Sequence, residues 1–169
     1  MAEATKVKDE FRTRAAADFA MARGGLEHAL RHVPADRLNW SPSPSARTPL
    51  EIAGHAAKAV RNMLGNMTGE TFAVPTPNAA EQLFREEDKG YRDLQTVLTM
   101  LQENGDAYLN WLDAVTDEHL ERVVPMPFGL PSMRVRDTVA FMALHMNMHV
   151  AQIQYIQTIY GDRDWHLGE

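Results

Sequence analysis

Residues 138–159 constrain this chain more than any other stretch, because they are apolar and contain neither glycine nor proline. A stretch of this kind favours a helix. It carries the motif H-M-N-M-H, in which His145 and His149 are four residues apart. Positions four apart share one face of a helix, with Cβ atoms about 5–6 Å apart, so both imidazoles can reach one cation.

A third histidine, His55, lies in a second amphipathic stretch whose start is well marked. Thr48 suits the N-cap, Pro49 suits the first helical position, and Glu51 completes a capping box. We therefore expect a helix from Pro49 to about residue 67, with His55 near the end of its second turn. Two ligands from one helix and one from its neighbour would leave a coordination position open, as in catalytic rather than structural metal sites.

Further apolar stripes and proline-rich loops predict the rest of the fold. Four helices of comparable length indicate an all-α protein, a four-helix bundle with a long crossover between the second and third helices. The length suits a single domain over residues 1–169. The predicted elements are helices over 8–32, 49–67, 78–115 with a break near Gly90, and 134–160, a crossover over 68–80, and one strand-like segment over 122–126.

Composition and charge exclude several classes of function. The net charge of −6 argues against a nucleic-acid partner, because phosphate contacts need a basic face. No window approaches the roughly 20 apolar residues of a membrane span, and no apolar segment of signal-peptide length opens the chain. The absence of cysteine removes disulfides and thiolate ligands. We therefore expect a cytoplasmic protein whose partner is a small molecule.

The two histidines of the last helix fall on its apolar arc, which we expect to face inward. A buried imidazole needs partners for both ring nitrogens, and two stacked imidazoles are difficult to satisfy unless they share a ligand. A metal ion would meet this need, although an H-x-x-x-H pair alone is also compatible with two ordinary core histidines. Met146 lies off the arc and could face a partner subunit. The arc comprises Thr138, Phe141, Met142, His145, Met148, His149, Gln152 and Ile156.

Three segments together resemble the DinB-like, or YfiT-like, family of metalloenzymes. They are W-S-P at Trp40 to Pro42, T-P-L-E-I-A-G-H ending in His55, and R-D-T-V-A-F-M-A-L-H-M-N-M-H-V-A-Q, which contains His145 and His149. The resemblance covers the whole chain in helix order and spacing. It implies a four-helix bundle that binds a divalent metal through one histidine of the second helix and two of the fourth.

The resemblance also implies an activity. Relatives include enzymes that load thiols such as bacillithiol, mycothiol or glutathione onto electrophiles, so we expect a metal-dependent thiol S-transferase that uses a low-molecular-weight thiol. Three neutral histidines would leave the cation its full +2 charge, which acidifies a bound thiol or water molecule. The alternatives are a hydrolase that uses metal-bound hydroxide and a non-catalytic metal-binding protein of stress response or interaction. Zinc and nickel suit imidazole best, manganese is also compatible, and the resemblance implies a homodimer.

Several further residues are candidates for supporting roles. Glu51, one turn before His55, and Gln152, three residues beyond His149, are candidates for catalysis or for orienting a ligand. Ordinary structural roles are the alternative for all of these candidates: Glu51 completes the cap of its helix, and arginines on helix surfaces are usually solvated. The candidates for binding a thiol cofactor are Arg61, Arg134, Arg136 and Trp40.

Overall fold

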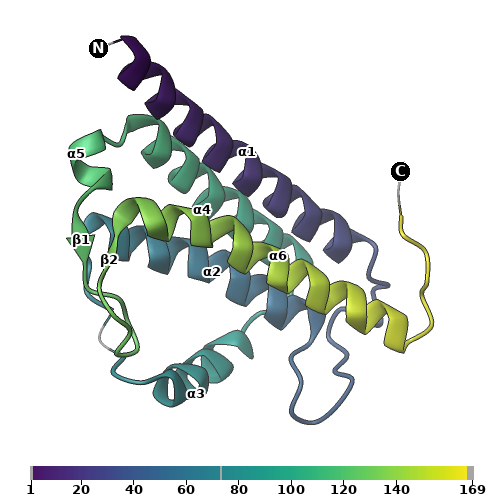
Figure 1. The fold of residues 1–169 in the computed structure, drawn as a ribbon. Helices are drawn as coiled ribbons and strands as arrows, with labels where there is room; N and C mark the ends of the chain where they lie inside the picture. Colours follow the sequence, from purple (N-terminus) through teal and green to yellow (C-terminus); the bar gives the residue numbers. More distant parts are fainter. Residues whose placement is uncertain (1, 73, 167–169) are drawn as a thin grey trace.

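The computed structural model of the protein describes residues 2–72 and 74–166, with side chains from residue 10 onward. Within this part of the chain, no helix combines the length and the hydropathy that a membrane span requires. The elements, in chain order, are α1 (Ala2–Arg31), α2 (Pro49–Thr68), α3 (Pro77–Asp88), α4 (Leu94–Ala114), α5 (Asp117–Leu120), β1 (Val123–Val124), β2 (Met133–Arg134) and α6 (Val135–Ile159) (Figure 1).

The long helices α1, α2, α4 and α6 form a four-helix bundle. α1 packs mainly against α6, whereas α2 packs against both α4 and α6. α1 and α2 follow each other in the chain but make few contacts, so they lie diagonally across the bundle. Figure 1 shows α3 outside the four long helices, below α2 and α6. The predicted bundle, with its long crossover between the second and third long helices, is confirmed.

Local signals explain the bounds of α2, the helix that carries His55. Thr48 Oγ1 accepts a hydrogen bond from the Glu51 backbone N–H, and the Glu51 carboxylate accepts one from the Thr48 backbone N–H. Pro49 occupies the first turn, and Gly69 ends the helix in the left-handed conformation, with φ of 104°. These caps satisfy backbone groups that a helix end leaves without partners, and an N-cap stabilises by about 1 kcal/mol. The predicted start and capping box are confirmed.

The crossover contains a helix of its own. The segment predicted as one helix with a break near Gly90 is two separate helices, α3 and α4, with the break between them. Side-chain oxygens of Thr76 and Asp93 cap the two N-termini. Because Asp93 starts α4 as a new helix, α3 can take a different direction from α4, and its last residue, Asp88, lies against His55 of α2.

Two other bounds differ from the prediction. α1 begins at Ala2 rather than at residue 8, because alanine, glutamate and lysine favour a helix even without an apolar stripe. The strand-like segment is reduced to Val123–Val124, which pairs antiparallel with Met133–Arg134. The largest fully buried side chains of the core come from all four long helices and include Phe19, Leu26, Leu50, Leu101, Tyr108, Leu112, Met142 and Ile153.

The buried face of α6 is rotated from the predicted arc. Met146, which we expected off the arc and facing a partner, is 1% exposed and belongs to the core, so that prediction is wrong. The reason is that α6 packs against α1 on one side and α2 on the other, which centres its buried strip between these two neighbours. The residues of the predicted arc that are exposed instead are Phe141, Met148 and Gln152.

Candidate metal centre

Three histidines from two helices come together in the bundle: His55 of α2 with His145 and His149 of α6. One ring nitrogen of each lies within 4.8 Å of the other two. The Nε2 atoms of His145 and His149 are 3.3 Å apart. Two nitrogens bound to one zinc ion at about 2.0–2.1 Å in tetrahedral geometry lie roughly 3.3–3.4 Å apart. The pair on α6 therefore already has the separation of two ligands of one cation.

Two of the histidines have an oxygen atom beside Nδ1, which leaves Nε2 as the nitrogen that can face a cation. His149 Nδ1 lies 2.8 Å from Gln152 Oε1, and His55 Nδ1 lies 3.3 Å from Asp88 Oδ2. An amide or carboxylate oxygen can only accept, so a proton on Nδ1 would face it and leave the Nε2 lone pair available to a cation. Such partners orient a ligating imidazole and raise its basicity. The residues present thus fit a divalent metal ion.

Asp88, at the end of α3, is a functional candidate that the sequence analysis missed. Its side chain is 3% exposed, and Arg47 Nε lies 2.8 Å from its Oδ2. A buried carboxylate is stable only when it is paired and hydrogen-bonded, so Arg47 holds Asp88 in place against His55. The available signal was an acidic residue directly before the helix break near Gly90. That signal was insufficient because the sequence does not show that α3 turns back over α2.

Burial keeps the histidines of α6 uncharged. It lowers the pKa of His145 to about 3, and the nearby His149 and His55 add to this effect. It also lowers the pKa of His149 to about 4, with the hydrogen bond to Gln152 acting in the opposite direction. Both rings are therefore neutral in neutral solution, as metal ligands must be.

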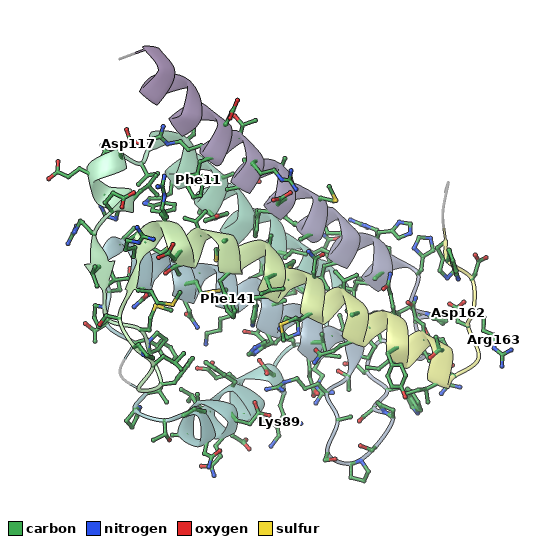
Figure 2. The ribbon with its side chains drawn as sticks, viewed as in Figure 1. Phe11, Lys89, Asp117, Phe141, Asp162 and Arg163 are labelled. Atoms are coloured by element: carbon green, nitrogen blue, oxygen red, sulfur yellow. The ribbon has the colours of Figure 1, made fainter. Side chains whose placement is uncertain are left out.

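The histidines adjoin a cavity of about 290 Å³ bounded by α2, α3, α6 and the loop over residues 125–132. His55 and His145 form part of its wall. Most other lining side chains are apolar. Lys58 also lines the cavity, and its ammonium group is paired with Glu87 at 2.6 Å. Figure 2 shows Phe141, another lining residue, on the stretch of α6 above α3. A substrate in this cavity would lie directly beside the histidine nitrogens.

The two candidates for catalysis occupy different environments. Gln152 contacts His149, as its spacing on the helix suggested. Glu51 uses one carboxylate oxygen for the cap at Thr48 and the other for an ion pair with Arg92 at 3.0 Å. It is not among the described residues that line the cavity. The structure therefore brings Gln152 to the histidines and leaves Glu51 in its capping role.

The four candidates for binding a thiol cofactor lie away from the histidines. None of them is among the described residues of the cavity wall. The three arginines are paired with acidic side chains on the surface, which accounts for their positions. The pairs are Arg61 with Glu70, Arg134 with Asp137 and Arg136 with Glu121, while Trp40 packs edge-on against Tyr160 beyond the end of α6.

Fold and site together define a class of protein: a four-helix bundle whose second and last long helices bring three histidines together beside a cavity. The model of the DinB superfamily matches residues 18–153, a span that contains His55, His145 and His149. The chain belongs to the DinB superfamily, and the resemblance noted in the sequence is confirmed.

Solved structures show the same fold. One is YfiT from Bacillus subtilis, described as a probable metal-dependent hydrolase with an unusual four-helix bundle topology. It is 17% identical, with a TM-score of 0.70 over 89% of this chain and 87% of YfiT. Another is the sibling lethal factor precursor DfsB, which is 16% identical, with a TM-score of 0.70 over 89% of this chain and 96% of DfsB. Comparison with curated protein sequences gives no significant match.

Proposed function

We propose that the protein is a metal-dependent enzyme of thiol S-transferase type, with a divalent cation held by His55, His145 and His149. The observation that carries the proposal is the approach of three ring nitrogens to within 4.8 Å, beside a cavity. Among the described residues this group has three members and no fourth ligand. Three protein ligands with one open position are typical of catalytic zinc, whereas structural sites are closed by a fourth.

The donor set favours zinc or nickel, because imidazole suits these ions better than it suits manganese. A divalent cation with three neutral ligands keeps its full charge and acidifies a thiol or water molecule that reaches it. The protein's own contribution is to hold the ligands in place. Asp88 and Gln152 orient His55 and His149, and Arg47 fixes Asp88.

The cavity wall supports group transfer over hydrolysis. Transfer to an acceptor other than water requires that water be kept away from the reacting atoms, and closed apolar sites do this. Phenylalanine and methionine side chains make up much of the wall. Asp88 is the one carboxylate among the described lining residues, and it is already bound to His55 and Arg47. A free general base that would activate water is therefore not evident among them.

Hydrolysis is the second candidate function, and two observations favour it. The arginines that could have held the carboxylates of an anionic thiol are paired with acidic residues away from the cavity. The structurally similar YfiT is described as a probable metal-dependent hydrolase. The same three histidines would then hold the cation, with water as the nucleophile.

The first test is the metal content of the purified protein beside His149→Ala, with His28→Ala, a histidine near the end of α1, as the control. We expect near-stoichiometric zinc or nickel in the wild type and the control, and its loss in His149→Ala. Negligible metal in all three after reloading would contradict the proposal.

The second test compares two reactions of the metal-loaded protein. Thiol consumption in the presence of benzyl chloride measures transfer, and cleavage of phenyl acetate without thiol measures hydrolysis. We expect metal-dependent thiol consumption that His149→Ala abolishes. Ester cleavage alone would favour the hydrolase. Bound metal with neither activity, across a panel of thiols, would indicate a non-catalytic metal-binding protein.

A further inference from the structure

Four phenylalanine side chains from separate segments line the cavity. They are Phe72 before α3, Phe84 in α3, Phe128 in the loop between the strands, and Phe141 in α6. The rings of Phe72, Phe84 and Phe128 contact one another, with centroids between 5.7 and 6.1 Å apart. Tilted and edge-on pairs at such distances are favourable aromatic contacts, so these three rings form one aromatic wall.

The aromatic wall continues to the histidines. Phe84 lies edge-on to His55, with ring centroids 5.2 Å apart. The ring centroid of Phe141 lies 6.0 Å from that of His145. A planar group bound against these rings would therefore lie next to the nitrogens that are available to a cation.

The backbone of Phe128, one residue of this wall, is strained. Its φ is 66°, in the left-handed region, which costs on the order of 1–2 kcal/mol for a residue with a side chain. Its backbone N–H donates to the carbonyl oxygen of Val74 at 3.2 Å, which ties the loop to the segment before α3. Strain of this kind persists where the surroundings over-determine it, and it is concentrated at binding and active sites.

The size and charge of the cavity limit what it can hold. An apolar cavity of about 150 Å³ in another protein binds benzene, so about 290 Å³ leaves room for a ring and a short substituent. The charge of Lys58 is balanced by Glu87. Burial of an unpaired charge against apolar walls costs several kcal/mol, so the cavity favours a neutral group.

One polar side chain of the wall has an unused acceptor. Asn66 is buried, and its Nδ2 donates to the carbonyl oxygen of Pro125 at 2.8 Å. Its Oδ1 has no hydrogen-bond partner among the described residues. A buried acceptor without a partner costs about 1–3 kcal/mol, which a hydroxyl or N–H group of a ligand would recover.

We infer that the cavity is a binding site for an uncharged aromatic group that carries a hydrogen-bond donor for Asn66. This deepens the proposed function, on which it rests for the reaction, by naming the substrate class: a neutral electrophile with a phenyl or benzyl group. The ring lies against the aromatic wall, and the reacting end extends toward His55 and His145. Binding of the ring itself does not depend on the metal ion.

The test is NMR of methionine methyl groups in the metal-free, full-length protein. Met63 and Met126 line the cavity and report on it, whereas Met21, exposed on α1, is the internal control. The probes are toluene, benzyl alcohol and benzoate. We expect toluene and benzyl alcohol to shift Met63 and Met126 but not Met21. Benzyl alcohol should bind roughly 2–10-fold more tightly than toluene because it can donate to Asn66, and benzoate should bind most weakly.

Variants locate the binding. Ala59 lines the cavity, so Ala59→Phe should fill it and abolish binding, whereas Ala107→Phe on the exposed face of α4 should not. If Ala59→Phe fails to fold, Phe84→Leu should weaken the binding of toluene instead. Asn66→Leu should remove the advantage of benzyl alcohol over toluene. Absence of shifts at Met63 and Met126 in the folded wild type would overturn the inference, as would benzoate binding as tightly as benzyl alcohol.

The outcome is distinguishable from that of the proposed function, because metal content is measured on separate, reloaded samples. Ring binding without any capacity for metal would retain the aromatic site and contradict the metal-dependent enzyme. Metal binding without ring binding would retain the metal-dependent enzyme and contradict the aromatic site.

Discussion

At the scale of single residues, the carboxylate of Asp88 determines the orientation of His55. In Asp88→Asn the shape is kept, but the ring loses its anionic neighbour and Arg47 keeps only Glu81 as an acidic partner. We expect the affinity for zinc to fall roughly 10–100-fold, measured by competition with a chelator. Glu87→Gln removes the neighbouring charge, which pairs with Lys58, and is the matched control. An equal fall in both variants would assign the effect to net charge rather than to the contact of Asp88 with His55.

The lowered pKa values of His145 and His149 predict how stability depends on pH in the metal-free protein. The folded rings titrate near about 3 and about 4, whereas the ordinary value is 6.5. Between these values the unfolded chain binds more protons, so the free energy of unfolding rises with pH. This contribution is complete above about pH 6.5 and is lost as the pH falls through about 4 for His149 and about 3 for His145. Urea denaturation across this window should show the slope in the wild type, and His145→Leu should make it shallower, because only His149 of the pair then contributes. A flat profile in the wild type would contradict the burial of neutral rings.

At the scale of helices, Gly54 of α2 shows how closely the segment between α3 and α4 packs against α2 near the site. A Cβ atom at Gly54 would overlap the ring of Tyr91, whereas a Cβ atom at Gly24 of α1 would meet open space. Gly24→Ala should therefore stabilise by up to about 1 kcal/mol through helix propensity. Gly54→Ala should instead destabilise by about 1–3 kcal/mol, because overpacking outweighs that gain. Chemical denaturation of both variants measures the difference. Equal stabilisation would show that Tyr91 does not pack against α2 as described.

The helices also show which structural features follow from local sequence. The start of α2 was predictable because Thr48, Pro49 and Glu51 act within one turn. The pairing of His145 with His149, and of His149 with Gln152, follows from spacing on one helix. The buried face of α6 was not predictable in the same way. It depends on where α1 and α2 lie around the helix, and Met146 is in the core for that reason.

At the scale of the whole molecule, the homodimer stays a prediction, and α6 offers a surface for it. Residues 138–160 contain no Asp, Glu, Lys or Arg, yet Leu144 and Tyr155 are 55% and 69% exposed. Phe141, Leu144, Met148 and Tyr155 recur with the spacing of a coiled-coil seam. We expect a second copy to pack here. Each chain carries a net charge of −6, and an uncharged face lets two chains meet without repulsion between like charges at the contact.

Light scattering measures this association. The wild type should be dimeric, and Leu144→Glu should be monomeric because it places like charges across the two-fold interface. Leu83→Glu, on the exposed side of α3, is the matched control and should remain dimeric. A monomeric wild type at high concentration would remove the homodimer from the description of this protein.

The sequence by itself determined the long helices in outline, the N-terminal cap of α2 and the spacing of the histidines, because each depends on interactions within a few turns of one helix. The approach of His55 to His145 was inferred with the help of the family resemblance, since it joins two helices distant in the chain. Only the tertiary structure decided that α3 carries Asp88 onto His55 and that four phenylalanines surround one cavity. These features join segments that meet only when the helices pack, and packing depends on the shape and burial of whole faces rather than on any local pattern.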